Sequence, residues 1–284
     1  MVADYSLSCE QVFVRSVRNL ITETNELYPL LRSGELRKSS GLPTWVPDWR
    51  QRFGAESRNL SDLALDINWL KSYYHYGAAS DTDPKLRRSS CQLELELQGL
   101  MVDEIHQVAS YFRASGWFGN KTKESLKVVR EWERLINKTW ESNDYRCPYE
   151  AGYEDAFWRL MATDYVTEIR GGEAIGKRAR STDETKCRML WSPDSASTSG
   201  VPAAVNKRFF ITKKGLIGLG NTNLRAGDGV WVLLGGKMPF ILRPTEEDQD
   251  GSRHYEYVTH AYVHGIMDGE VMREGREPEW ITLV

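Results

Sequence analysis

The last third of the chain holds a series of short apolar runs, and this series constrains the fold more than any other feature. The runs are separated by glycines and charged loops, and they cover residues 208–212, 216–219, 229–234, 240–242, 255–263 and 280–284. Short runs rich in β-branched and aromatic residues and bounded by turn residues are typical of β-strands. Six such strands in succession predict a small antiparallel β-barrel or sandwich over residues 206–284.

The first 169 residues alternate between helical and strand periodicity. Apolar residues at helical spacing predict a helix that follows a capping box at Ser8 and stops near Gly34, and further helices at 61–73, 122–140 and 154–162. Between them, leucines at 93, 95 and 97 alternate with polar residues, which predicts a strand that continues over 101–108. Residues 170–205 are rich in Gly, Ser, Thr and charge and predict a mobile insert. The expected class is α+β: an α+β region at 1–169, the insert, and the β-module at 206–284.

Composition excludes several classes of protein. The net charge of the 284 residues is -3, so no general positive field attracts nucleic acid or an anionic membrane. No apolar run reaches the ~18 residues that span a bilayer, and the first residues do not form a signal segment. The 4 cysteines are isolated in the sequence, which fits reduced thiols. We therefore expect a cytoplasmic protein that binds neither nucleic acid nor membrane.

One stretch has the form of a phosphate-binding loop. Residues 171–177 read G-x-x-x-x-G-K, but Arg178 follows where the loop needs Ser or Thr to hold magnesium. No buried strand precedes the stretch and no apolar helix follows it, so we interpret it as a chance match. The dense glycines between 215 and 236 likewise fit no dinucleotide fingerprint. No cofactor is expected.

The histidines and carboxylates near the end of the chain are candidates for a metal or acid–base site. On a single strand over 255–263, His260 and His264 would lie ~13 Å apart, too far to share one zinc ion. Asp228, His264, Asp268 and Glu270 form a possible acid–base set, but no nucleophile motif accompanies them. Asp228 follows Gly227 and Asp268 precedes Gly269, which is typical of turns. We expect no metal site and no catalytic residue.

Several stretches, in order, resemble fungal heterokaryon-incompatibility (HET) proteins in the region that follows the HET core. They are L-P-T-W-V-P-D-W at 42–49, R-A-G-D-G-V-W-V-L-L-G-G at 225–236, P-F-I-L-R-P at 239–244 and A-Y-V-H-G-I-M-D-G-E at 261–270. The family-motif positions, structural or interacting, are Trp45, Pro47, Asp48, Trp49, Gly227, Asp228, Gly235, Pro239, Tyr262, His264, Gly265, Asp268 and Gly269. Residues 95–103, 156–160 and 208–220 extend the likeness over nearly all of the chain.

The resemblance implies a role in fungal nonself recognition and programmed cell death. HET cores are thought to resemble TIR domains, and any NAD-directed activity would belong to that core, which we expect to be absent from this chain. The implied function is a non-catalytic regulatory or interaction region whose partner is a protein, a HET core or another member of the pathway. The alternative is a small-molecule binder or enzyme that uses a pocket near His264 and Asp268. The oligomeric state is left open.

The Trp45–Trp49 loop is predicted to be structural. Pro43 and Pro47 restrict its backbone, and two indoles carry a large apolar area that water would penalise. We expect at least one indole to be buried against the helices or the barrel, and Trp49→Ala to cost about 3–5 kcal/mol if that indole is fully buried. The alternative is an exposed partner site, in which tryptophan is enriched.

Overall fold

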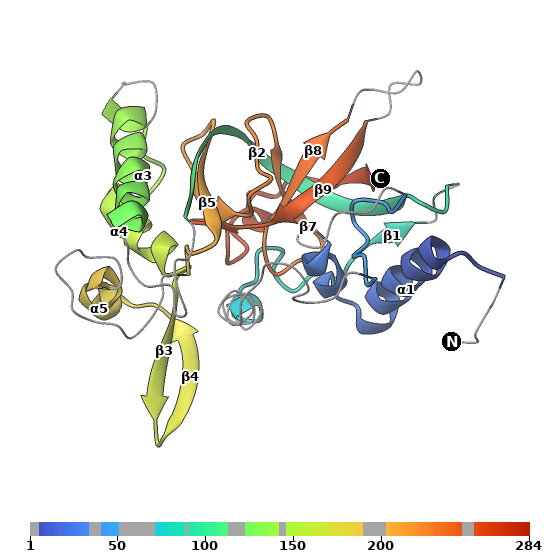
Figure 1. The fold of residues 1–284 in the computed structure, drawn as a ribbon, viewed down its shortest axis with the longest axis horizontal. Helices are drawn as coiled ribbons and strands as arrows, with labels where there is room; N and C mark the ends of the chain where they lie inside the picture. The colour runs from blue at the N-terminus through green and yellow to red at the C-terminus, as the bar shows by residue number, and fades with distance from the viewer. Residues whose placement is uncertain are drawn as a thin grey trace.

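The chain has an α+β fold in which the described α-helices precede the C-terminal strands of a β-barrel (Figure 1). The computed structural model describes residues 6–33, 41–50, 72–87, 89, 91–112, 123–141, 146–189, 203–245 and 253–284. No helix in these segments combines the length and apolarity needed to cross a membrane. The predicted helix at 61–73 lies almost wholly outside the described residues.

Five strands close the barrel. In order around the ring they are β2 (Leu95–Phe112), β11 (Glu279–Leu283), β9 (His254–His260), β8 (Phe240–Pro244) and β7 (Gly229–Leu233), and β7 pairs with β2 again. The barrel predicted for the C-terminal part is confirmed, with two additions. It takes β2 from the upstream region, and β11 runs parallel to β9. The predicted C-terminal strands therefore need an upstream strand to complete their hydrogen bonding.

The second half of β2 carries a sheet extension outside the ring. There β2 pairs with β5 (Lys207–Thr212), which continues through β6 (Ile217–Gly220) to β10 (Tyr262–Val263), while β1 (Leu86–Arg87) pairs near the start of β2. The prediction of one strand over 255–263 is wrong. Ala261 N donates to Pro239 O, and Tyr262 then pairs with Leu219, so the chain leaves the barrel and joins the extension.

The helices follow the predicted periodicity, with shifted ends. Helix α1 (Cys9–Thr24) has the expected capping box between Ser8 and Gln11, but it ends at Asn25 in a left-handed conformation, well before Gly34. A left-handed residue is a common helix terminator. The apolar pattern beyond it continues in a 3-10 turn, Tyr28–Arg32. Helices α3 (Lys123–Glu141) and α4 (Gly152–Met161) match the two later predictions closely.

Part of the predicted insert has regular structure. Strands β3 (Tyr165–Arg170) and β4 (Glu173–Arg178) form a separate hairpin, a 3-10 turn follows at Ser181–Asp183, and helix α5 covers Glu184–Met189. The hairpin turn is Gly171–Gly172 with φ of +59° and +89°, the conformation that a two-residue turn requires. The G-x-x-x-x-G-K stretch is thus the turn and second strand of a hairpin.

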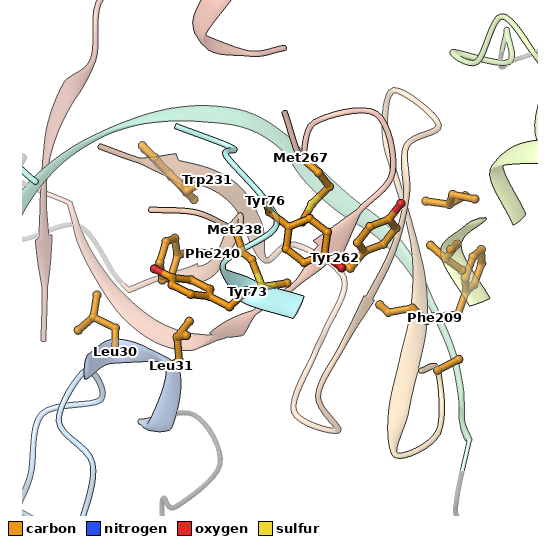
Figure 2. Close-up of a cluster of buried hydrophobic side chains, with 14 of the residues drawn as sticks. Leu30, Leu31, Tyr73, Tyr76, Phe209, Trp231, Met238, Phe240, Tyr262 and Met267 are labelled. Carbon is orange, nitrogen blue, oxygen red and sulfur yellow. The ribbon is translucent and has the colours of Figure 1, made fainter. Parts of the chain in front are cut away.

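The barrel wall is buried on both faces. Along β7, Trp231 and Leu233 join one apolar cluster, whereas Val230 and Val232 join a second. The first cluster extends to aromatic residues such as Tyr73, Phe240 and Tyr262 (Figure 2). Because alternate side chains on a strand point to opposite faces, both the lumen and the outer wall at β7 are filled with apolar side chains.

The tryptophan loop ties the start of the chain to the barrel. Trp45 is fully buried and its Nε1 donates to Leu93 O at 3.1 Å. Thr44 binds the carbonyl of Val284 through its own N–H, at 2.9 Å, and its hydroxyl accepts from Tyr257 N at 2.7 Å. Trp49, in contrast, is 41% exposed and packs edge-on against Phe13. The expected buried indole is Trp45, and the condition of full burial for Trp49 is not met.

Trp45→Ala is expected to lower the free energy of unfolding by about 3–5 kcal/mol, because it removes a buried indole and its hydrogen bond. Trp49→Ala, which removes a half-exposed ring, is expected to cost less than about 2 kcal/mol. Urea denaturation followed by far-ultraviolet circular dichroism measures both. Equal losses in the two variants would contradict the assignment of Trp45 as the anchor.

Candidate functional site

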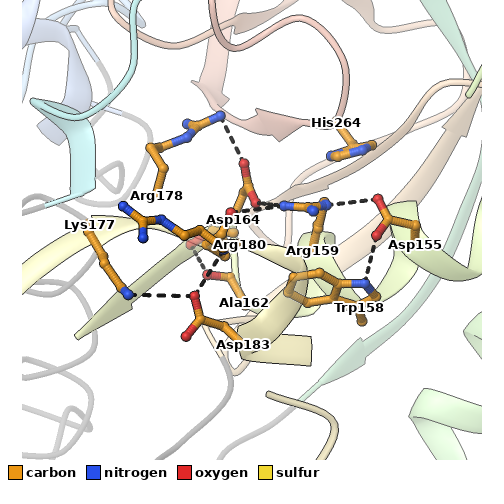
Figure 3. A network of polar contacts seen from close by, with 12 residues as sticks. Asp155, Trp158, Arg159, Ala162, Asp164, Lys177, Arg178, Arg180, Asp183 and His264 are labelled. Carbon is orange, nitrogen blue, oxygen red and sulfur yellow. Dashed lines mark hydrogen bonds and ion pairs between the residues drawn. The ribbon is translucent and has the colours of Figure 1, made fainter. Parts of the chain in front are cut away.

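A polar network joins helix α4, the β3–β4 hairpin and the loop after β10. Its charged members are Asp155, Asp164 and Asp268 on one side and Arg159 and Arg178 on the other, and Figure 3 shows most of them around the end of α4. Each of these three carboxylates contacts an arginine. Every carboxylate of the network therefore has an arginine partner where α4, the hairpin and the barrel extension meet.

The end of helix α4 places the central carboxylate. Thr163 and Asp164 follow the helix with φ of +51° and +50°, a left-handed conformation that costs energy in non-glycine residues. Arg159 offsets this cost: its Nε binds Asp155 at 2.7 Å, and its Nη1 binds Asp164 at 2.8 Å. Burial raises the pKa of Asp164, while its hydrogen bond to Arg159 and the charges of both arginines act in the opposite direction.

Arg178 connects the hairpin to two other elements. Its Nη2 lies 2.9 Å from Asp164 and 2.6 Å from Asp268, and its guanidinium lies 5.0 Å from the centre of the Tyr76 ring. Its Nη1 is buried and has no hydrogen-bond partner among the described residues. The residue that breaks the phosphate-loop pattern therefore helps to fix the hairpin to the body.

His264 borders this network and its ring is largely buried. Its Nδ1 lies 2.9 Å from the Tyr262 hydroxyl, and its ring packs against Tyr149. Burial, followed by the charge of Arg159, lowers the pKa of His264 to about 4. His264 is therefore neutral at pH 7, and a group with this pKa is a weak base.

The structure brings together only part of the predicted acid–base set. His264 and Asp268 both border the arginine network, and Glu270 accepts a hydrogen bond from Asp268 N. Asp228 lies in a different cluster, where it binds Arg243 at 2.8 Å and caps the turn at Arg225 N. The described contacts of Asp228 therefore support the turn role.

Most of the other family-motif residues lie in turns or are buried. Gly227, Gly235, Gly265 and Gly269 have φ between +78° and +91°, and Pro239 supplies the carbonyl that binds Ala261. Pro47 and Asp48 are buried, and Asp48 binds Arg50. A Cβ at Gly235 would lie 2.3 Å from Pro84, and one at Gly269 would lie 2.2 Å from the Ser80 hydroxyl oxygen. These glycines therefore serve close turns.

The histidines do not converge. His254 lies 4.0 Å from Glu94, His260 ends β9 and His264 follows β10. Within the described segments, no group of three or more His, Cys, Asp or Glu side chains could hold a metal ion. Sequence reasoning missed Arg159, Asp164 and the role of Arg178, because these residues form no recognisable motif with one another and meet only through the fold.

Two comparisons with known proteins find sequences similar to this chain. Residues 197–282 match the sequence model described as "Het-6 beta-barrel domain". The chain is also 24% identical, over 94% of its length, to "Heterokaryon incompatibility protein 6, OR allele" of Neurospora crassa. The chain is therefore similar to a fungal heterokaryon-incompatibility protein over most of its length. It spans 45% of that relative's length, and no solved structure matches it.

The residues that match the Het-6 barrel domain are not the same as the residues that form the barrel. The matched range runs from before β5 into β11, whereas the ring closes only with β2, at residues 95–112. The barrel of this chain thus includes a strand, β2, that lies far upstream of the matched range.

The neutral state of His264 predicts a pH dependence of stability. Its pKa is lowered from 6.5 to about 4, so between these values the unfolded chain binds more protons than the folded one. Stability is therefore lost as pH falls below 6.5, by about 2 kcal/mol between pH 7.5 and pH 5 from this group alone. Urea denaturation at both pH values, on wild type and on His264→Gln, measures the difference.

The raised pKa of Asp164 acts in the opposite direction, since it favours proton binding by the folded state. This contribution is common to the wild type and the His264→Gln variant, so the difference between them isolates the histidine. If the variant loses as much stability as wild type between pH 7.5 and pH 5, His264 is not buried in its neutral form.

Arg178→Met is expected to destabilise the chain by about 1–3 kcal/mol, because it leaves Asp164 and Asp268 without one of their partners. Arg170→Met, on the same hairpin, is the matched control. Arg170 is exposed and binds only Glu168 among the described residues, so its loss should cost less than about 0.5 kcal/mol. Thermal melting of both variants tests the prediction, and similar melting temperatures would contradict the anchoring role of Arg178.

Proposed function

We propose that this chain is a non-catalytic regulatory or interaction region of a HET-type protein in fungal nonself recognition. The main support is the barrel, whose wall is buried on both faces at β7 and whose strands form a closed ring. A ligand-binding barrel of this kind needs a lumen with room for the ligand and a few converging polar groups. Here large apolar side chains such as Trp231 and Phe240 occupy the wall.

The state of the polar network supports the same proposal. Asp155, Asp164 and Asp268 are paired with arginines, and His264 is neutral. Catalytic acids and bases have pKa values near the working pH. Groups that bind one another across three elements are suited to fixing the hairpin and helix α4 on the barrel.

The partner that we propose is a protein, either a HET core or another member of the pathway, and the proposed location is the cytoplasm. The relative in Neurospora crassa is about twice as long as this chain, so the region outside the match is the first partner to test. Programmed cell death as the outcome of that interaction is part of the same proposal.

The second candidate is a small-molecule binder or enzyme that uses His264 and Asp268. The pair of Tyr262 and His264 favours it, because a hydroxyl 2.9 Å from an imidazole nitrogen has the hydrogen-bond geometry of an acid–base pair. The buried Arg178 Nη1, which lacks a described partner, is a further polar atom in that region.

A binding experiment tests the proposed interaction. The purified chain is mixed with the region of the Neurospora crassa relative that lies outside the match, and association is followed by isothermal titration calorimetry. We expect saturable binding with one site per chain. A fragment of equal length from an unrelated protein is the control, and absence of binding to the HET-protein fragment contradicts the proposed partner.

A second assay separates the two candidate functions. The chain is incubated with NAD and nicotinamide release is followed, with no turnover expected. Turnover that His264→Gln abolishes and Asp228→Asn leaves intact would establish the second candidate, because His264 borders the arginine network and Asp228 lies in a different cluster.

A further inference from the structure

None of the other described strands pairs with the β3–β4 hairpin. It forms a two-stranded sheet of its own, and Figure 1 shows it projecting from the body of the protein. The pair Arg170–Glu173 closes its two-residue turn. In such a hairpin the closing pair is hydrogen-bonded, and hydrogen-bonded pairs then alternate with non-bonded pairs. The N–H and C=O groups of Ala174 and Gly176 therefore point away from β3.

The base of the hairpin agrees with this alternation. Asp164 and Ala179 fall on the hydrogen-bonded positions, and Ala179 N donates to Asp164 O at 3.0 Å. No described strand pairs with the outer edge of β4. The unpaired N–H and C=O groups of an exposed edge are a template for another strand, and charged side chains on that edge restrict which strand can pair with it.

The side chains of β4 make this edge complementary to itself. Glu173, Ile175 and Lys177 alternate along the strand and so share one face. An antiparallel copy centred on Ile175 places Glu173 opposite Lys177 of the second chain, twice, with the two Ile175 side chains opposite each other. The same register aligns the outward groups of Ala174 with those of Gly176, so backbone and side-chain patterns agree.

The exposed groups fit this arrangement. Ile175 is 46% exposed, and Glu173 is exposed with no described ion pair. Lys177 contacts Glu168 at 3.1 Å and Asp183 at 3.8 Å. Its ammonium group therefore lies near the face that carries Ile175, and Glu173 of a second copy would reach the same face. The edge of β3 lacks this complementarity, because the register that aligns the outward groups of Thr167 and Ile169 places Glu168 opposite itself.

We propose that two copies of this chain associate through β4, edge to edge and antiparallel, to form a four-stranded sheet. The occupant of this edge is a second copy because the Glu173–Ile175–Lys177 pattern matches its own reverse. Two strands of this length make a small interface, so a weak, concentration-dependent dimer is expected. The proposal concerns self-association and does not rest on the proposed function.

Sedimentation equilibrium of the full chain measures the association. At low salt the average mass should rise with concentration from 32.6 kDa toward twice that value, and added salt should weaken the rise. A mass that stays at the monomer value at every concentration overturns the proposal and leaves the edge for a different protein.

Charge exchange tests the register. Glu173→Lys and Lys177→Glu each put like charges opposite each other, and each should raise the dimer dissociation constant about tenfold. The double variant restores opposite charges and should restore association. Because the double variant also lacks the contacts of Lys177 with Glu168 and Asp183, its recovery excludes damage to the monomer as the cause. Failure to recover overturns this register.

Proline on either edge tests which strand pairs. Ala174→Pro removes an outward N–H of β4, whereas Ile169→Pro removes the outward N–H of its cross-strand partner on β3. Only Ala174→Pro should abolish association, and both variants should melt like wild type. If Ile169→Pro abolishes association and Ala174→Pro does not, the dimer uses β3 and the proposal is wrong.

Discussion

The backbone pairing of β2 is the constraint on which the rest of the structure depends. This strand pairs with β11 and β7 in the ring, with β5 in the extension and with β1 near its start. It changes partners near Gly99, where a Cβ would lie 2.7 Å from Leu233 Cδ2 and 3.0 Å from Val232 O. Glycine permits this close approach of two backbones. Irregular register at Met101/Asp103 and Val108/Tyr111 bends the strand from the ring into the extension.

The polar network solves a different problem, which is how an appended hairpin and helix keep a fixed orientation. Arg178 and Arg159 are held between carboxylates from α4 and from the loop after β10, so movement of either element would separate charges that are partly buried. Breaking a buried pair is costly because the remaining charge is left uncompensated. The tryptophan loop likewise fixes the N-terminal part of the chain to the barrel. Trp45 does so by apolar burial and Thr44 by backbone hydrogen bonds.

Periodicity predicted the local elements of this fold well and its pairing poorly. The helices around Val17 and Trp132 and the strands around Trp231 and Ile241 follow from apolar spacing, because burial of one face imposes that spacing. The closure of the ring by β2 and the break at Ala261 depend on partners far apart in sequence, which periodicity does not encode. The Gly171–Gly172 pair is a local sequence signal for a tight turn, but in the sequence these glycines were considered only as part of a phosphate-loop pattern. Within the candidate site, His264 and Asp268 were identified from sequence, whereas Asp164 lacks any motif and is placed by two left-handed residues after a helix.

Closure of the ring has a consequence for the synthesis of the protein. Roughly 190 residues separate Leu95 of β2 from its partner Leu283 of β11. At ribosomal rates of about 5–20 residues per second, β11 is synthesised roughly 10–40 s after β2. During that time the edge of β2, with Leu95 and Leu97, is open to the wrong strands, in its own chain or in a neighbouring one. A nascent chain of this kind gains from any factor that shields β2 until translation reaches residue 283, and slower codons after β2 would lengthen its exposure.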